Sequence, residues 1–262
     1  MSEKIIITNQ DERGIFYLNL NRPEIMNAFD DELIHQLNNI FLDLRNNKNI
    51  KALVVTGNGK GFSAGADLSW MRRMSDVSRE ENYNDSMKLA EMLNTLYNLP
   101  FPTIAAVNGA AYGGGVGLVT ACDIAVANKY AKFCLSEARL GLIPSVISPY
   151  VVKAVGERNA KYLFFTSAPI SSEEAVKIGM VNFSVENEEL ESTVEEIILK
   201  ILQGGPEAIK SAKKLIYYVE SKEINEKVMN ETAKRIANSR ASSEGKEGIS
   251  AFLNKRKPNW QE

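Results

Sequence analysis

Residues 102–127, PTIAAVNGAAYGGGVGLVTACDIAVA, decide the fold. An apolar run at 103–109 predicts a buried strand, the glycines after it predict a turn, and the next apolar run predicts a helix that stops near Asp123. Another strand-like run begins directly afterwards. A buried strand, a helix and a second buried strand are typical of parallel strands joined by crossover helices, so this stretch predicts an α/β core.

The preceding residues continue the same alternation. An amphipathic helix is predicted behind Asp30 and Asp31, which are candidate capping residues. Strand patterns lie at 4–8, 14–20, 52–57 and within 124–137. A turn signal separates the first two, which predicts a hairpin.

The last third of the chain has a different pattern. From Glu157 onward the periodicity is helical, apart from one strand pattern at 180–185. No linker-like tract separates the two regions. We therefore expect an α/β body at residues 1–195 and a helical C-terminal region at 196–262.

Composition excludes several kinds of chemistry. The 262 residues include one histidine, His35, and two cysteines, which are too few for a His/Cys metal cluster, so no metal site is expected. His35 lies on a predicted helix among polar residues, and we interpret it as a solvated side chain. The balance of 31 basic and 33 acidic residues argues against a nucleic-acid partner.

The sequence also indicates the cellular compartment of the protein. Cys122 and Cys134 lie in apolar contexts, which favours a reducing compartment, and the first residues lack the features of a secretory signal, so we expect a cytoplasmic protein. Residues 92–122 carry no charge, but Pro100, Pro102 and several glycines interrupt them, so no membrane span is predicted.

Two glycine-rich segments, 57–67 and 109–117, are the first candidate ligand loops. The first does not fit a P-loop, and the second matches only half of a dinucleotide fingerprint. Glycines let backbone N–H groups approach a ligand, and a helix N-terminus adds unpaired amides and partial positive charge. Two such amides converging from separate loops would stabilise an oxyanion. The alternative is that the glycines only permit close packing.

Carboxylates are the remaining candidates. Glu137 follows an apolar run, and apolar surroundings raise the pKa of a carboxyl toward the range of a general base or acid at neutral pH. The alternative for Glu137 is a surface turn residue paired with Arg139. Asp67 and Asp123 are better interpreted as helix caps or loop braces.

Five segments together resemble the crotonase superfamily, the enoyl-CoA hydratases and isomerases. They are NRPEIMNAF (21–29), LVVTGNGKGFSAGADL (53–68), residues 102–127, FCLSEARLGLIP (133–144) and EGISAFLNKRKPNW (247–260). The resemblance implies a crotonase-like spiral of ββα turns with a helical C-terminal region that trimerises, giving a homotrimer or a dimer of trimers.

The resemblance also implies a site. The amides of Ala66 and Gly114 would bind the thioester oxygen of an acyl-CoA substrate, and Glu137 would be the catalytic carboxylate. The residues expected to contact substrate are Ala64, beside the adenine, Asp67, Gly117, Phe252 and Lys255. Coenzyme A is part of the substrate, so no separate cofactor is implied. The family often has a basic residue near position 25, where this chain has Ile25.

One departure affects the reaction. Typical hydratases of the family carry a first glutamate where this chain has Gly117, and a single carboxylate fits a Δ3,Δ2-enoyl-CoA isomerase. However, GADLSWMRRM (65–74) and residues 135–160 are similar to a bacterial hydratase subgroup assigned to methylglutaconyl-CoA in leucine breakdown, whose members also lack that glutamate. We therefore favour an enoyl-CoA hydratase. An isomerase and a noncatalytic acyl-CoA-binding protein stay open as alternatives.

A substrate with a distal carboxylate would need a cation. Arg72, Arg73 and Arg139 are candidates, each with the alternative of being a solvated surface charge.

Overall fold

The computed structural model describes residues 4–261, which form two compact units. The first unit contains the described residues up to Leu99 together with Thr103–Val194. The second contains Pro100–Pro102 and the described residues from Glu195 onward. Within the described residues, no helix is both long enough and apolar enough to cross a membrane.

A six-stranded sheet forms the centre of the first unit, in the order β1-β2-β3-β5-β7-β10. Its strands are β1 (Ile6–Gln10), β2 (Ile15–Leu20), β3 (Ala52–Gly57), β5 (Thr103–Val107), β7 (Ile124–Asn128) and β10 (Phe183–Val185). β1 and β2 are antiparallel, as the predicted hairpin requires, and every other pair is parallel. The predicted α/β core with parallel strands is confirmed.

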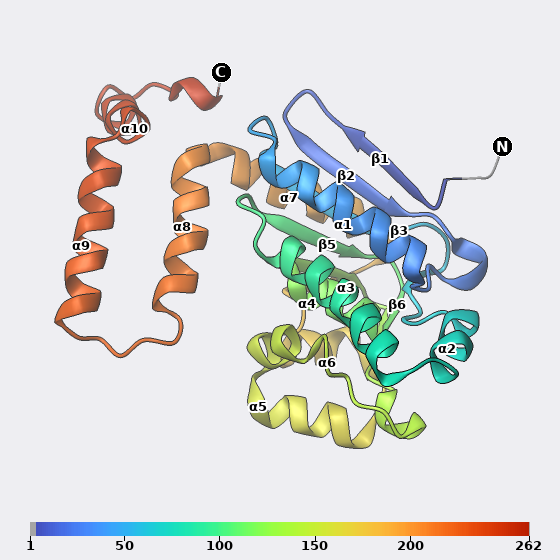
Figure 1. Cartoon of the computed structure of the whole chain (residues 1–262). Coiled ribbons are helices and arrows are strands. Elements are labelled where there is room, and N and C mark those ends of the chain that lie inside the picture. The colour runs from blue at the N-terminus through green and yellow to red at the C-terminus, as the bar shows by residue number, and fades with distance from the viewer. Residues whose placement is uncertain (1–3, 262) are drawn as a thin grey trace. The chain divides into compact units, whose positions relative to one another are not determined.

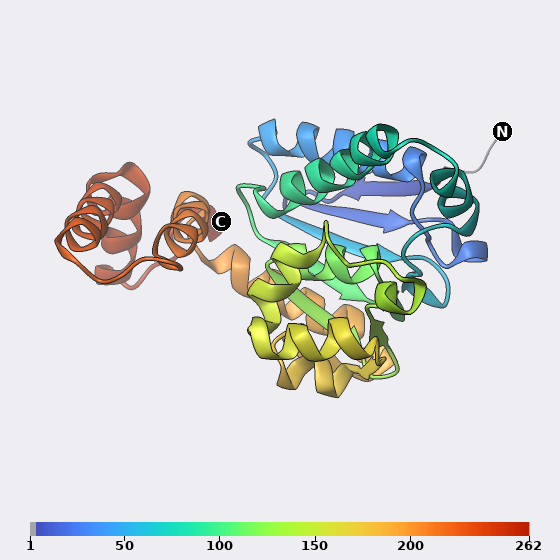
Figure 2. The same ribbon diagram turned by 60° about the horizontal axis from the view of Figure 1, so that its bottom comes forward.

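Helices α1 (Asp31–Asn46) and α3 (Arg79–Tyr97) lie side by side across one face of this sheet (Figure 1 and Figure 2). Asp30 caps α1 by accepting a hydrogen bond from the Leu33 N–H at 2.9 Å, which confirms one of the two predicted caps. Five buried apolar side chains of α1 recur at helical spacing and pack toward the sheet. They are Leu33, Ile34, Leu37, Phe41 and Leu44.

A second sheet of four short strands has the order β4-β6-β8-β9. Its strands are β4 (Gly61–Ser63), β6 (Ala110–Tyr112), β8 (Lys132–Cys134) and β9 (Ile170–Ser171). The sequence predicts loops at β4 and β6 and no strand at β9. These strands are only two or three residues long and pair with distant segments, so they have no local periodicity to detect. This small sheet brings the two glycine-rich segments together.

The first unit is completed by helices and 3-10 turns. They are η1 (Pro23–Ile25), α2 (Leu68–Ser75), α4 (Gly114–Ala121), η2 (Glu137–Leu140), α5 (Ser148–Thr166), α6 (Ser172–Lys177) and η3 (Asn187–Glu189). The helix predicted to stop near Asp123 ends at Ala121. Asp123 accepts hydrogen bonds from the N–H and hydroxyl of Thr103, so it braces the loop as expected.

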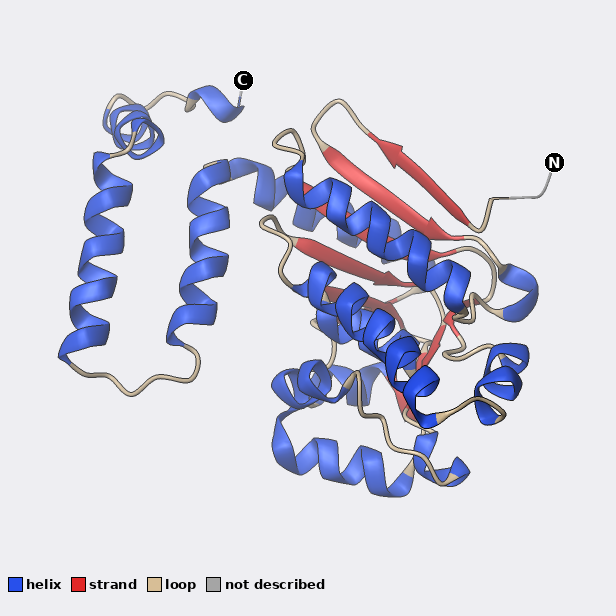
Figure 3. Ribbon diagram, viewed as in Figure 1, coloured by secondary structure: helices blue, strands red, loops and turns tan. Residues whose placement is uncertain are grey.

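The second unit is helical, as Figure 3 shows. Helix α7 (Leu190–Gln203) leads into it from the first unit, and α8 (Pro206–Val219), α9 (Glu226–Ala241), α10 (Ser243–Leu253) and η4 (Asn259–Gln261) follow. The indole Nε1 of Trp260 donates to the Gln203 carbonyl at 3.2 Å, which ties the end of the chain to α7.

Candidate active site

The two glycine-rich segments pack directly against each other. A Cβ atom on Gly109 would lie 2.1 Å from the carbonyl oxygen of Lys60, and one on Gly65 would lie 2.7 Å from the carbonyl oxygen of Tyr112. Both distances are too short for any side chain. Parallel pairing of β4 with β6 maintains this approach. The glycines therefore permit close packing, and that packing brings the two candidate amides into neighbouring loops.

Ala66 presents an open amide. It forms an isolated parallel bridge with Phe29, in which the Phe29 N–H donates to the Gly65 carbonyl at 2.6 Å and the Asp67 N–H donates to the Phe29 carbonyl at 2.8 Å. The Ala66 N–H takes no part in the bridge, and no other hydrogen bond among residues 4–261 uses it. Ala66 is also exposed. Its N–H is therefore available to a ligand.

Gly114 presents the second open amide. It is the first residue of α4, and its N–H has no acceptor within the helix because it lies in the first turn. Gly113 precedes it with φ 48° and ψ −114° and cannot cap the helix with a side chain. Gly114 is half-buried, and the helix dipole adds partial positive charge at this end. The site prefers an acceptor with negative charge.

Phe29 contacts both amide positions. Its backbone bridges Ala66, and its ring atoms Cδ2 and Cε2 lie 3.0 and 3.1 Å from where a Cβ atom on Gly114 would be. The side chain is fully buried. Phe29 is thus a positioning residue for the pair of amides. The sequence analysis did not predict this contact. The one feature of the sequence that points to Phe29 is its position at the end of the segment 21–29, which resembles the family.

Glu137 lies beside the start of α4. Strand β8 pairs with β6, and the Gly113 N–H donates to the Cys134 carbonyl at 2.9 Å, which places Glu137 just after this strand next to the glycine turn. Its Oε1 atom is 3.2 Å from the position of a Cβ atom on Gly113. Its Oε2 atom is buried and has no hydrogen-bond partner among the described residues.

The environment of Glu137 suits an acid–base group. Burial raises the pKa of its carboxyl above the ordinary glutamate range, an effect that its own backbone N–H partly offsets. The predicted alternative was an ion pair with Arg139, but none forms between these two side chains, and Arg139 is exposed. A half-buried carboxyl with one unpartnered oxygen can take and return a proton.

Gly117 is enclosed by apolar side chains. It lies one turn along α4 from Gly113, to whose carbonyl its N–H donates at 3.1 Å. A Cβ atom on Gly117 would lie 2.4 Å from Cγ2 of Ile147 and 3.5 Å from Cδ1 of Leu93. The position therefore holds no side chain larger than hydrogen. The sequence shows the missing glutamate but not Ile147, because the two residues are thirty positions apart.

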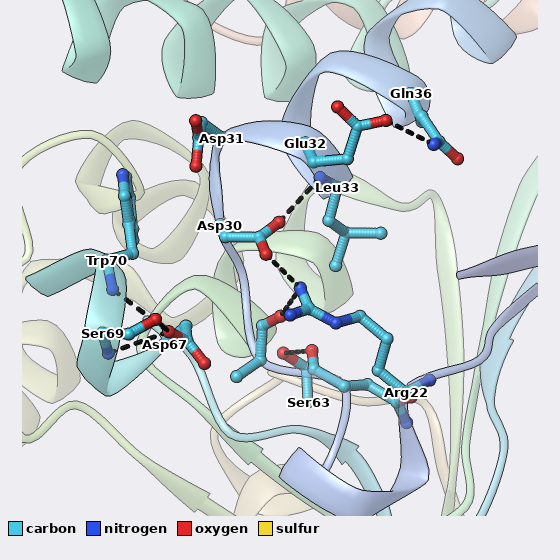
Figure 4. Close-up of polar contacts among 12 residues, drawn as sticks. Arg22, Asp30, Asp31, Glu32, Leu33, Gln36, Ser63, Asp67, Ser69 and Trp70 are labelled. Carbon is cyan, nitrogen blue, oxygen red and sulfur yellow. Dashed lines mark hydrogen bonds and ion pairs between the residues drawn. The ribbon is translucent and has the colours of Figure 1, made fainter. Parts of the chain in front are cut away.

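Asp67 is used as a helix cap. Its Oδ1 accepts hydrogen bonds from the N–H groups of Ser69 at 2.8 Å and Trp70 at 3.1 Å, at the start of α2 (Figure 4). These bonds lower the pKa of its carboxyl, with the Ser69 hydroxyl as the largest cause. Its interpretation as a cap is confirmed, while contact with substrate stays a prediction.

A second cluster in Figure 4 supports the segment before α1. Arg22 donates to Asp30 at 2.6 Å and to the Ala28 carbonyl at 3.3 Å. Because Phe29 lies between Ala28 and Asp30, these contacts fix the segment that bridges Ala66. Of the candidate cations, Arg73 forms an exposed ion pair with Asp31.

Three further residues are predicted to contact substrate. Ala64 is half-buried in the first glycine-rich segment, and its N–H donates to the Met26 carbonyl at 2.8 Å. Phe252 and Lys255 are exposed residues of the second unit. His35 is exposed on α1 and contacts Asn39, as expected for a solvated histidine. Residues 4–261 contain no group of three His, Cys, Asp or Glu side chains arranged to bind a metal.

Comparison with known proteins shows the family to which this chain belongs. The family model for enoyl-CoA hydratase/isomerase matches residues 10–262. A crystal structure of a Legionella pneumophila protein, provisionally classed as an enoyl-CoA hydratase/isomerase (crotonase), superposes with a TM-score of 0.94 at 42% identity and covers 99% of this chain and 100% of its own. The chain belongs to the enoyl-CoA hydratase/isomerase family, within the crotonase superfamily.

Two curated relatives show the range of reactions. A crotonyl-CoA hydratase of Syntrophomonas wolfei is 32% identical, covering 98% of each chain. A 1,2-epoxyphenylacetyl-CoA isomerase of Escherichia coli K12 is 31% identical, covering 97% of each chain. The family makes this chain an enzyme of the hydratase/isomerase type, and the similar identities do not select one reaction.

Proposed function

We propose that this protein is an enoyl-CoA hydratase that adds water across the α,β double bond of an acyl-CoA thioester. The observation that carries the proposal is the buried, unpartnered Oε2 of Glu137 beside the start of α4, where the open amides of Ala66 and Gly114 lie on neighbouring loops. A carboxylate base near two amide donors is the arrangement that enolate chemistry needs.

In the proposed mechanism, the N–H groups of Ala66 and Gly114 donate to the thioester oxygen. Glu137 takes a proton from water while the hydroxyl oxygen bonds to the β-carbon, and the π electrons move to form the enolate. Glu137 then returns a proton to the α-carbon on the same face, which makes the addition syn. Each amide donor contributes a factor of about 10²–10³ to the rate in comparable oxyanion sites.

A Δ3,Δ2-enoyl-CoA isomerase is the second candidate, and a specific observation favours it. Ile147 fills the space over Gly117, so one carboxylate is available on this face of α4. Glu137 would then remove a proton from one substrate carbon and return it to another, with the same two amides stabilising the intermediate enolate. A third candidate, an acyl-CoA-binding protein without activity, would bind these esters and convert none.

For the acyl group we propose 3-methylglutaconyl-CoA, in leucine breakdown. Support comes from the segments 65–74 and 135–160, which are similar to the hydratase subgroup assigned to that substrate. Arg139 is exposed two residues after Glu137 and is the candidate for the distal carboxylate. Arg73 is less available because of its ion pair with Asp31.

The test is an activity panel of crotonyl-CoA, 3-methylglutaconyl-CoA and a 3-enoyl-CoA with the full chain. We expect hydration of the first two, fastest for 3-methylglutaconyl-CoA. Glu137→Gln should lower kcat by about 10²–10⁴-fold with little change in binding of the CoA ester. Glu188→Gln, at an exposed position of η3, is the matched control and should retain full activity. Full activity of Glu137→Gln would refute the assignment.

We further propose a homotrimer or a dimer of trimers in the cytoplasm. The second unit exposes several large apolar side chains, which is typical of a surface that a partner covers. They include Ile216, Met229, Ile236, Ile249, Phe252 and Leu253. Cys122 and Cys134 are not joined in a disulfide in the described structure, which supports the proposal of a reducing compartment. Light scattering on the full chain tests the subunit number, and a monomer would refute the assembly.

A further inference from the structure

Position 117 lies one helical turn from the residue that the carboxyl of Glu137 contacts. Gly113, which contacts Glu137, and Gly117 are four residues apart and linked by a helical hydrogen bond of 3.1 Å. A carboxylate at 117 would therefore begin one helical turn from Gly113, against which the carboxyl of Glu137 lies.

Ile147 occupies the space that such a side chain would need. Its Cγ2 atom is 2.4 Å and its Cβ atom 3.1 Å from the Cβ position of Gly117, and its side chain is buried. Ile147 is the N-cap residue of α5, so its backbone is fixed by the helix start. It cannot yield to a new side chain without a shift of that segment or a change of rotamer in a close-packed interior.

The same loop carries Glu137. The Leu142 N–H donates to the Glu137 carbonyl at 3.0 Å, and the chain runs from there to Ile147. One short segment thus supplies both the carboxylate of Glu137 and the apolar side chain of Ile147, which excludes a second carboxylate at position 117. The contact of Gly117 with Leu93, at 3.5 Å, is ordinary packing and does not exclude a side chain.

Building on the proposed function, we infer that Ile147 is a specificity-determining residue of the site. By filling the space over Gly117, it leaves position 117 without room for a second acid–base group beside Glu137. Both proton transfers of the reaction then pass through one carboxylate. Ile147 thereby keeps the site to a single carboxylate, and we expect the ratio between water addition to a 2-enoyl-CoA and proton relay in a 3-enoyl-CoA to depend on that restriction.

The steric part of the inference is tested without any activity, by melting temperatures of Gly117→Ala, Ile147→Gly and the double variant. We expect Gly117→Ala to lower Tm, and the same substitution to cost little once Ile147 is glycine. Leu93→Ala is the matched control, and combining it with Gly117→Ala should not restore the Tm that Gly117→Ala loses. A Gly117→Ala variant as stable as the wild type would overturn the inference.

The catalytic part is tested by Gly117→Glu combined with Ile147→Gly. We expect the ratio of crotonyl-CoA hydration to 3-enoyl-CoA isomerisation to rise at least about tenfold over Ile147→Gly alone, because a second acid–base group becomes available. The kcat/KM profile should also gain a second ionisation. A folded double variant with an unchanged ratio would overturn the inference.

Two further outcomes are decisive. If the glutamate variant does not fold, the shorter Gly117→Asp with Ile147→Gly takes its place, and failure of both to fold would show that Ile147 is not what excludes the carboxylate. If the wild type converts no ester of the panel, the proposed function fails. A gain of hydration in the double variant would then still support the role of Ile147, and no gain would overturn it.

Discussion

The Oε1 atom of Glu137 lies 3.2 Å from the point where a Cβ atom on Gly113 would stand. Gly113 therefore leaves room for the carboxyl of Glu137, the proposed catalytic group, and, with φ 48° and ψ −114°, also turns the chain into α4. An L-residue at this position would meet both a strained backbone and the carboxyl oxygen.

Gly113→Ala should therefore reduce both stability and activity. The backbone strain should cost about 1–3 kcal/mol, and displacement of Glu137 should lower kcat. Melting temperature and steady-state kinetics measure the two effects. Gly156→Ala is the control, because Gly156 has φ 73° and nothing within 4 Å of its Cβ position. That variant should lose stability without losing kcat, and equal kcat losses in both variants would contradict the role given to Gly113.

Glu137→Gln should stabilise the protein at neutral pH. Burial raises the pKa of this carboxyl in the folded state, so the folded state binds the proton more tightly than the unfolded state does. The free energy of unfolding of the wild type then falls as pH rises through the unfolded and then the folded pKa. The side chain of the glutamine variant is neutral at every pH, so its free energy of unfolding does not fall in this way. Tm measured against pH should show the variant more stable at pH 8, with the difference shrinking toward acid pH; a constant difference would contradict the burial argument.

Phe29→Leu should lower kcat more than it changes KM. The ring packs against Gly114 while the backbone bridges Ala66, so a smaller side chain loosens the relative placement of the two amides. We expect about a tenfold loss of kcat, less than the loss of a whole donor. Phe41→Leu, also fully buried but in the middle of α1, should lose similar stability and keep its kcat. If the two variants have equal kcat and KM, Phe29 is a core residue that does not position the amides.

Asp67→Ala should destabilise the protein by about 1 kcal/mol, the usual cost of an N-cap. The cause is the loss of the hydrogen bonds from the N–H groups of Ser69 and Trp70. Asp67→Asn can still accept these bonds and should be close to the wild type. Chemical denaturation measures the stability. A rise in KM for Asp67→Asn at unchanged stability would instead identify Asp67 as a substrate-binding residue.

Lys255→Ala should weaken binding of the CoA portion of the substrate. An exposed lysine that contacts a phosphate contributes a charge-assisted bond, so KM for the CoA ester should rise about three- to tenfold. The corresponding N-acetylcysteamine ester has no nucleotide and should show no change. Lys246→Ala, exposed on α10, is the control. Equal KM values for wild type and Lys255→Ala would show that Lys255 does not bind the CoA portion of the substrate.

Some elements of this chain are visible in its local pattern. The strand predicted at 52–57 is β3 with the same bounds, and the helix predicted after the glycine turn is α4. Both have continuous apolar runs bounded by glycines, so neighbouring residues suffice to define them. Glu137 is also found from its neighbours, because a lone carboxylate in an apolar segment is unusual.

Other features depend on contacts between distant segments. The small sheet of β4, β6, β8 and β9 has strands too short to show a period. Phe29 and Gly114 are far apart in the chain, as are Ile147 and Gly117, and each pair is close only in the folded protein. Residue types alone do not show which side chain will fill a given space.

From the sequence one obtains the α/β body by periodicity, the family by the resemblance of five segments, and the candidate groups by local context. Composition excludes a His/Cys metal cluster, and Glu137 and the two glycine-rich loops are recognised from their neighbours in the chain. Only the tertiary structure decided that Phe29 joins the two amide positions and that Ile147 closes the space over Gly117. The physical reason is close packing: the room beside a residue is set by whichever segment folds against it.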